Sequence, residues 1–266
     1  MRLSIVVITW NGLLHIQECL NSISEVIDYN RDEVVVVDNG SNDGTVEWVQ
    51  INHPQVRLLE LDTNIGVAPA RNKGIWLAKG DYIMVLDNDT RYISQISPGD
   101  VIESYFREHA DVGLFSFILK NPDGTFQRNV RRFPDVLQPF FARISVLRKL
   151  GFFNRCHRRH LMDDVNLEEM TVPFDVDYVL GANQIFRKET AVLLGGYDEH
   201  MFNGPEDCDF CLRVHRQGLR VQYLPAAEII HDYQRRTKGF NLKTLKHIYY
   251  FYYFFFKNKS LYKISV

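Results

Sequence analysis

The first 90 residues repeat one pattern: a short apolar run, a polar turn, and then a stretch with apolar residues at helical spacing. The apolar runs cover 3–8, 34–37 and 82–86, a third strand with two charged residues is expected at 56–61, and the helical stretches between the strands cover 13–23, 45–50 and 68–80. Unbroken apolar runs are typical of strands buried on both faces, and helices between them favour parallel order. We therefore expect an α/β fold with a mostly parallel sheet covered on both faces.

Each apolar run is closed by polar side chains that are suited to binding. These are Thr9, Asp38, Asn64, Asp87 and Asp89. Ligands of open α/β sheets bind outside the carboxyl ends of the strands, so these residues should gather along one rim. Neither GxGxxG nor GxxxxGK[ST] follows a strand, and a nucleotide would have to be held by other means.

The run 82–86 delivers two carboxylates, Asp87 and Asp89, with Asn88 between them. Two carboxylates at one place repel each other unless a cation or a shared proton separates them. Oxygen ligands suit Mg²⁺ or Mn²⁺, which often bind one or two carboxylates together with substrate phosphates. The alternative is a solvated turn in which one aspartate caps the next element.

Four ordered segments resemble the GT-A glycosyltransferases of family 2, with the closest likeness to the bacterial rhamnosyltransferase-like branch. They are VVVVDNGSNDGT, NIGVAPARNKGI, YIMVLDNDT and GGYDEHMFNGPEDCDFCLRVHRQG. The resemblance covers about residues 1–235. It implies a GT-A fold, with a Rossmann-like nucleotide-sugar-binding half at 1–120 merged with an acceptor and catalytic half at 121–235. A C-terminal aromatic and basic tail, expected to be helical, follows at 236–266.

The resemblance also implies roles for residues of the first half. Asp38 corresponds to the aspartate that accepts the N3–H of uracil or thymine, and Gly66 and Arg71 lie in the segment that passes the ribose and pyrophosphate. For Arg71 the alternative is an ordinary charge on a helix surface. The implied nucleotide-binding set is Thr9, Asn11, Asp38, Asn64, Gly66, Arg71, Asn72 and Asn88.

The implied metal site consists of Asp87 and Asp89 with His231, which follows a short apolar strand. A divalent cation, Mn²⁺ or Mg²⁺, would act there as a Lewis acid on the diphosphate. In this branch the pair is typically written Asn-Pro-Asp, so Asn88 is a departure from it.

In the second half, Glu206 and Asp207 resemble the acidic pair whose aspartate takes the proton from the acceptor hydroxyl. Direct displacement with one base inverts the anomeric configuration. We expect Asp207 to be the base, Glu206 to be the alternative, and Asp209 to be supporting. An acidic first turn of a helix explains the same residues structurally. The segment expected near the donor sugar is Gly181, Ala182 and Asn183.

Composition limits the remaining alternatives. The 266 residues carry a formal charge of −2, which gives no sign of nucleic-acid binding. Four cysteines are too few for a disulfide framework and no apolar run is long enough for a membrane span, so we expect a cytoplasmic protein that could lie at the inner face of the membrane. Cys208 and Cys211 form a CxxC, but zinc would need further ligands, and hydrophobic helix cysteines explain the pair.

Two further segments are basic or aromatic. Residues 128–160 are rich in arginine and could form a lip for a polyprenyl-diphosphate-linked or other anionic acceptor. The arginines are Arg128, Arg131, Arg132, Arg143, Arg148, Arg155, Arg158 and Arg159. The tail, with YYFYYFFF at 249–256, could pack on the core, form a homodimer or lie at the bilayer surface.

These observations favour an inverting, metal-dependent glycosyltransferase for surface polysaccharide synthesis. It would transfer L-rhamnose from dTDP-L-rhamnose to a saccharide or lipid-linked saccharide, with a UDP-hexose as the alternative donor. Two other classes stay open: a sugar-1-phosphate nucleotidyltransferase, and a binding module without catalysis.

Overall fold

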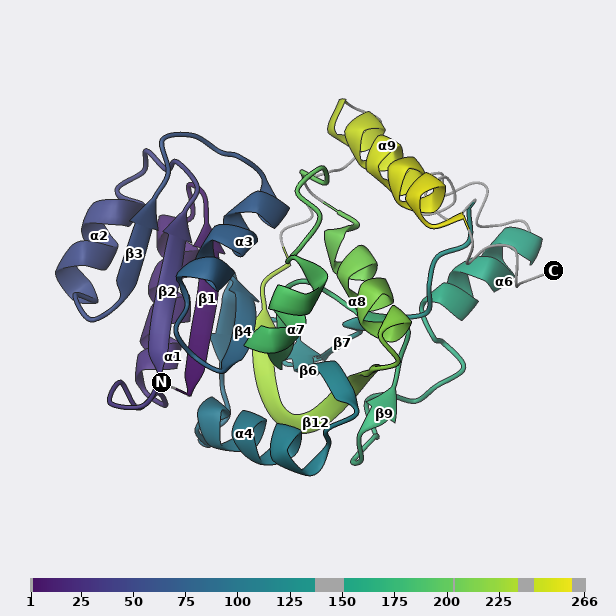
Figure 1. The fold of residues 1–266 in the computed structure, drawn as a ribbon, viewed down its shortest axis with the longest axis horizontal. Coiled ribbons are helices and arrows are strands. Elements are labelled where there is room, and N and C mark those ends of the chain that lie inside the picture. Colours follow the sequence, from purple (N-terminus) through teal and green to yellow (C-terminus); the bar gives the residue numbers. More distant parts are fainter. Residues whose placement is uncertain (1, 137–150, 203, 234–241, 260–266) are drawn as a thin grey trace.

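The computed structural model describes residues 2–136, 151–202, 204–233 and 242–259. In this part of the chain a ten-stranded sheet runs through the molecule, in the order β3-β2-β1-β4-β11-β6-β12-β5, with β7 paired to β6 and β9 to β12 (Figure 1). Its strands are β1 (Leu3–Thr9), β2 (Glu33–Asp38), β3 (Arg57–Glu60), β4 (Tyr82–Asp87), β5 (Thr90–Tyr92), β6 (Val112–Lys120), β7 (Phe126–Gln127), β9 (Phe174–Asp175), β11 (Asn183–Arg187) and β12 (Arg220–His231).

Eight helices and a two-stranded ribbon complete the described chain. The ribbon pairs β8 (Val130–Arg131) with β10 (Tyr178–Val179). The helices are α1 (Leu13–Ser24), α2 (Thr45–Asn52), α3 (Val67–Leu77), α4 (Pro98–Glu108), α6 (Gly151–His160), α7 (Lys188–Leu194), α8 (Glu206–Arg216) and α9 (Leu242–Lys257).

The first four strands are parallel, as the sequence pattern predicted. Successive side chains of a strand point to opposite faces; both faces are buried in β1, β2 and β4, whereas β3 at the end of the sheet is only partly buried. Val6 and Val85 belong to one hydrophobic core, while Ile5 and Met84 belong to the other. Burial on both faces explains why these strands are written as unbroken apolar runs.

Strand β11 joins the two halves of the chain. It comes from the second half and lies antiparallel between β4 and β6 of the first half, so strands of both halves share one sheet. The α/β architecture with a mostly parallel first half is confirmed. The pairing of β11 brings the loop before it, at Gly181 and Ala182, next to the end of β4, where Asp87 N–H donates to Ala182 O at 3.4 Å.

One predicted helix boundary is wrong. The helical stretch was expected to reach residue 80, but the helix α3 ends at Leu77, three residues before Gly80. Gly80 instead lies against β1: its N–H donates to Ser4 Oγ at 2.8 Å, and a Cβ there would be 2.6 Å from the Ser4 nitrogen. The glycine is needed for close approach to the strand.

The helix α9 packs on the core beside α8. Phe254 and Phe255 are buried, and Lys257 Nζ lies 2.7 Å from Asp198 and 3.0 Å from Asp209. Core packing is therefore established for this part of the tail, while its remaining residues, 236–241 and 260–266, lie outside the described ranges. Among the described helices none is both long and apolar enough to cross a bilayer.

Candidate functional site

The carboxyl ends of β1, β2 and β4 meet at one rim of the sheet. Thr9 stands opposite Asp38 in the β1–β2 register, and Ile8 stands opposite Asp87 in the β1–β4 register. Asn64 is connected to this rim through Asn39, which follows Asp38: the Asn39 side-chain amide donates to Asn64 Oδ1 at 3.2 Å. The structure therefore brings together the polar residues that close the apolar runs.

Asp87, Asp89 and His231 form a group at the end of β4. One ligand atom from each residue lies within 4.8 Å of the others, and the His231 Nε2 is 3.5 Å from Asp89 Oδ1. Burial lowers the pKa of His231, but the hydrogen bond to Asp89 and the charges of Asp89 and Asp87 outweigh it and raise the pKa. Two carboxylates and an imidazole are a suitable donor set for Mn²⁺ or Mg²⁺, so these residues fit the predicted metal.

Arg71 connects this group with the acidic start of α8. Its guanidinium donates to Asp87 Oδ1 at 2.7 Å, to Glu206 Oε1 at 3.0 Å and to the Gly181 carbonyl at 2.9 Å. The side chain is 2% exposed, so the alternative of a helix-surface charge is wrong. Burial would lower the pKa of Arg71, but the two carboxylates raise it and keep the group charged. Arg71 thus balances protein carboxylates, and its predicted contact with a phosphate stays a prediction.

Glu206 and Asp207 open α8 and differ in their surroundings. Glu206 is buried and paired with Arg71, whereas Asp207 retains partial exposure. Asp207 Oδ2 accepts from Gly181 N at 3.0 Å, and its Oδ1 accepts from Cys208 N at 2.7 Å. Burial raises the pKa of both carboxyl groups; the charge of Asp207 raises that of Glu206 further. A base with a raised pKa takes a proton more readily near neutral pH, and Asp207 is the member of the pair that reaches solvent.

Asp38 has one carboxylate oxygen available. Its Oδ2 accepts from Ser41 N at 2.8 Å, while Oδ1 is buried and has no hydrogen-bond partner within the described chain. A buried carboxylate oxygen without a donor is rare in folded proteins. A ligand donor such as the imide N–H of uracil or thymine would satisfy it.

Asn39 is a structural residue of the rim that the sequence reasoning missed. It is buried, donates to Gly66 O at 3.1 Å and accepts from Ile65 N at 2.9 Å, so it shapes the loop before α3. The available signal was its place directly after Asp38, where we considered only a turn.

Gly66 and Asn72 contact the loop before α8. Gly66 has φ +101°, and a Cβ there would be 2.8 Å from the Phe202 ring. The absence of a side chain at this position therefore allows the Phe202 ring to pack against the backbone. Asn72 is buried and exchanges hydrogen bonds with the backbone of Tyr197 at 2.7 and 2.9 Å. Both residues therefore hold the loop before α8 against α3, and their predicted nucleotide contacts stay predictions.

Asn88 lies between the ends of β4 and β1. Its Nδ2 donates to Thr9 Oγ1 at 2.9 Å, and a Cβ at Gly12 would be 2.0 Å from that nitrogen. Asn11 has φ 48°, and its Oδ1 accepts from Asn42 N at 2.9 Å. These contacts tie the first loop to the metal-site turn and to the loop after Asp38.

The segment expected near the donor sugar divides in two. Gly181 lies between Arg71 and Asp207, and a Cβ there would be 2.4 Å from the Arg71 guanidinium. Ala182 is 4% exposed at the end of β4. Asn183 is fully buried, and its Oδ1 accepts from Phe117 N at 2.8 Å on β6. This position supports a structural role for Asn183 rather than the predicted sugar contact.

The arginine-rich segment is mostly paired with nearby acids. Arg132 forms a two-point contact with Asp164, with N–O distances of 3.0 and 2.7 Å. Arg131 has no ion-pair partner in the described chain; it donates to the Val130 carbonyl at 2.7 Å, and burial lowers its pKa. Arg143 and Arg148 lie outside the described residues.

The cysteines of the CxxC and Asp209 belong to the interior. Cys208 and Cys211 are both buried, and burial raises the pKa of both thiols. Asp209 is fully buried and lies 2.7 Å from Arg213 Nε. Asp209 therefore anchors α8 and α9.

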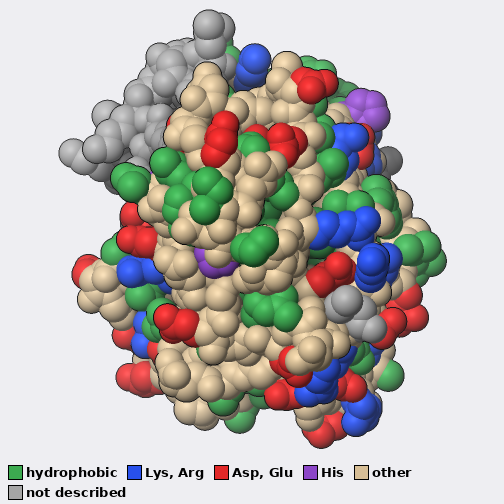
Figure 2. Space-filling model, turned by 90° about the vertical axis from the view of Figure 1, so that its left-hand side faces the viewer, with side chains coloured by type: hydrophobic (Ala, Val, Ile, Leu, Met, Phe, Trp, Pro, Cys, Tyr) green, Lys and Arg blue, Asp and Glu red, His purple; other side chains and the backbone are tan. Residues whose placement is uncertain are grey.

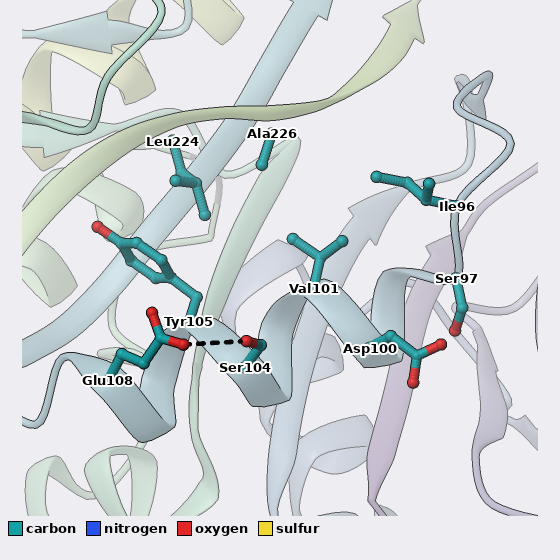
Figure 3. A pocket seen from close by; sticks show the side chains of 9 residues that line it. All are labelled: Ile96, Ser97, Asp100, Val101, Ser104, Tyr105, Glu108, Leu224 and Ala226. Carbon is teal, nitrogen blue, oxygen red and sulfur yellow. Dashed lines mark hydrogen bonds between the residues drawn. The ribbon is translucent and has the colours of Figure 1, made fainter.

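A hollow of about 500 Å³ lies between α4 and β12, away from the rim. Figure 3 shows Val101 and Tyr105 of α4 facing Leu224 and Ala226 of β12 across it. None of the predicted site residues lines this hollow. On the face shown in Figure 2, acidic and basic side chains are interspersed, so this face carries no continuous basic surface.

Comparisons with known proteins agree with this architecture. A model of the family "Glycosyl transferase family 2" matches residues 4–170. An N-acetylglucosaminyl-diphospho-decaprenol L-rhamnosyltransferase of Mycobacterium tuberculosis is 26% identical over 252 residues, covering 86% of this chain and 75% of the relative. A poly-β-1,6-N-acetyl-D-glucosamine synthase of Staphylococcus aureus is 25% identical, covering 81% of this chain and 48% of the relative.

Two solved structures share the fold. The chain matches GalNAc-T7, crystallised with UDP, GalNAc and Mn²⁺, with a TM-score of 0.67 at 16% identity, covering 90% of this chain and 45% of that one. It matches residues 1–349 of S. aureus TarS with a TM-score of 0.60 at 18% identity, covering 87% of this chain and 60% of that one. The family model covers more than half of the sequence, and the chain belongs to glycosyl transferase family 2, with the GT-A fold.

Proposed function

We propose that this protein is a metal-dependent, inverting glycosyltransferase that moves a sugar from a nucleotide-diphosphate donor to a saccharide or lipid-linked saccharide. The observation that carries the proposal is the convergence of a cation donor set and a partly exposed carboxylate at one rim. Asp87 and Asp207 are linked there through Arg71 and Gly181. Family membership supports this function over a nucleotidyltransferase or a silent binding module.

On the donor side, Asp38 offers its free Oδ1 to the N–H of a pyrimidine base. Asp87, Asp89 and His231 would hold Mn²⁺ or Mg²⁺, which when bound supplies Lewis acidity to the departing diphosphate. Arg71 stays on Asp87 and Glu206, so it fixes the spacing between the metal site and α8.

On the acceptor side, Asp207 takes the proton of the attacking hydroxyl. Its raised pKa suits this transfer, and its two backbone donors hold the carboxylate in one orientation. Arg131, which has no ion-pair partner in the described chain and lies in the arginine-rich segment, is the proposed contact for an acceptor diphosphate. That acceptor class is taken from the mycobacterial relative, whose name gives a decaprenyl diphosphate.

For the donor sugar we propose L-rhamnose, because the same relative is named an L-rhamnosyltransferase, and we propose dTDP as its carrier, as the sequence resemblance implies. A UDP-hexose is the second candidate, favoured by the TarS complex with UDP-GlcNAc and by the N-acetylglucosamine polymer synthase. Thermal-shift measurements with dTDP- and UDP-sugars, each with and without Mn²⁺, would separate the two. Stabilisation by neither class would count against the whole proposal.

Asp207→Asn tests the assigned base. We expect kcat for sugar transfer to fall by about 10²- to 10⁴-fold while the nucleotide still binds. Asp209→Asn is the matched control on the same helix, expected to lower stability without a specific effect on the pH dependence of transfer. Unchanged transfer by Asp207→Asn would remove Asp207 as the base.

A further inference from the structure

The hairpin between β6 and β7 contacts His231 from the side opposite Asp89. Gln127, the last residue of β7, lies with its Oε1 2.6 Å from His231 Nδ1. Neither the hairpin nor Gln127 belongs to the segments that carry the family resemblance. The position of the proton on the His231 ring decides which nitrogen can bind a metal ion, because only a nitrogen with a free lone pair can do so.

The hydrogen bonds of the hairpin determine the answer in sequence, beginning at its tip. The Thr125 hydroxyl has one proton and donates it to Asp123 Oδ1 at 2.6 Å. Its oxygen can then only accept, and it accepts from Asn121 Nδ2 at 2.9 Å. This fixes the direction of the Asn121 amide, whose Oδ1 turns toward Gln127.

The next step fixes the amide of Gln127. Its Nε2 donates one proton to Asn121 Oδ1 at 2.8 Å and the other to the His231 carbonyl at 3.1 Å. Both amide protons are used, so Oε1 can act only as an acceptor. The His231 Nδ1 must therefore be the donor in the 2.6 Å contact.

We propose that the β6–β7 hairpin, through Gln127, locks His231 in the tautomer with a proton on Nδ1, so that Nε2 presents a lone pair to a divalent cation beside Asp87 and Asp89. Gln127 is thus a positioning residue for the metal site. This inference rests on the proposed function, because it takes the Asp87–Asp89–His231 group as the seat of the cation. Outer partners of a ligating histidine generally fix its tautomer and orientation, and their loss typically lowers metal affinity by about 10- to 100-fold.

Removing the lock should change His231 before any chemistry occurs. In ¹⁵N–¹H NMR spectra of the full chain at alkaline pH, without metal, we expect the His231 ring of the wild type to be protonated on Nδ1, with the signal assigned by its loss in His231→Gln. In Gln127→Leu the ring should lose this single-tautomer signature. A wild-type ring protonated on Nε2 would overturn the proposal.

Mn²⁺ titration followed by calorimetry gives the second measurement. We expect Gln127→Leu to weaken Mn²⁺ binding about 10- to 100-fold, and Gln127→Glu, which still accepts from Nδ1, to recover most of that loss. Thr125→Val, on the exposed tip, should weaken binding in the same direction with little effect on folding. The control is Gln50→Leu, because Gln50 is exposed whereas Gln184 is buried. This variant should bind Mn²⁺ as tightly as the wild type does.

The outcomes separate this inference from the proposed function. If the wild type binds Mn²⁺, Asp89→Ala abolishes the binding, and Gln127→Leu binds as tightly as the wild type, the positioning role is overturned while the metal seat stands. If wild-type binding is absent, or is unaffected by Asp89→Ala, the seat itself is overturned and this inference falls with it.

Discussion

Replacing Arg71 by Met is the most direct test of how the site is held together. The substitution keeps much of the side-chain volume but removes the charge that lies between Asp87 and Glu206. The two ion pairs differ in exposure: the Glu206 carboxylate is 6% exposed, while that of Asp87 is 31% exposed. Solvent can therefore relieve Asp87, whereas Glu206 and the Gly181 carbonyl are left without their donor in a dry environment.

The size of the effect follows from these contacts. Removing one member of a buried ion pair typically costs about 3–5 kcal/mol of unfolding free energy, and we assign most of it to the Glu206 side. For a chain of this length, 1 kcal/mol corresponds to about 2 °C in Tm. We therefore expect Arg71→Met to lower Tm by about 6–10 °C.

Urea unfolding monitored by circular dichroism, at neutral pH and without metal, measures this loss. The control is Arg107→Met, because Arg107 forms an exposed i,i+4 pair with Glu103 and should change stability by at most about 0.5 kcal/mol. The double variant Arg71→Met/Glu206→Gln should lose less than the sum of the single changes, since it no longer buries an unpaired carboxylate. An Arg71→Met protein within about 1 kcal/mol of the wild type would refute the description of this cluster as a buried ionic network.

Three further predictions concern other parts of the site. Burial raises the pKa of Asp207, and a base must be deprotonated to act. In a pH–rate profile, kcat/KM for transfer should therefore fall with decreasing pH at a midpoint above the ordinary aspartate pKa of 3.8, and a midpoint at or below 3.8 would contradict this. Lys257→Met should lower the unfolding free energy measured in urea by about 1–2 kcal/mol, because the amine contacts the fully buried Asp209. Lys259→Met should have almost no effect, and equal losses in the two variants would argue against the contact. Gly66→Ala should lower the free energy of unfolding by about 1–3 kcal/mol and weaken nucleotide binding, as measured by calorimetry. Gly124→Ala is the control, because Gly124 also has a positive φ but has open space around it. A smaller loss of unfolding free energy at Gly66 than at Gly124 would contradict the Phe202 contact.

The arrangement of the first half was predictable because local patterns specify it. Strands buried on both faces are written as unbroken apolar runs, and the carboxyl ends of parallel strands must lie at the same rim. The positions of Asp38 and Asp87 followed from this rule alone. The boundary at Gly80 failed because the glycine serves a contact with Ser4, 76 residues away, which has no signature in the helix itself.

The interior of the site was less predictable because it depends on contacts between distant segments. Arg71 meets Glu206 across 135 residues, and Asn72 meets the Tyr197 backbone across 125. The family resemblance suggested that Arg71 would lie near the pyrophosphate, whereas in the structure its guanidinium contacts protein carboxylates. Gln127 carried no motif, and its place beside His231 depends on β7 pairing with the end of β6.

The docking of α9 also bears on the order in which the chain can fold. Lys257 contacts Asp198 and Asp209, which flank the acidic pair at the start of α8, so these contacts wait for a segment that the ribosome makes late. During synthesis the parallel strands 3–87 can form their sheet while the loop before α8 still lacks its last partner. A nascent chain stopped before residue 242 would then contain the nucleotide-side rim but hold the proposed base without this support. On this view, the start of α8 gains these ionic contacts only after the parallel strands have formed.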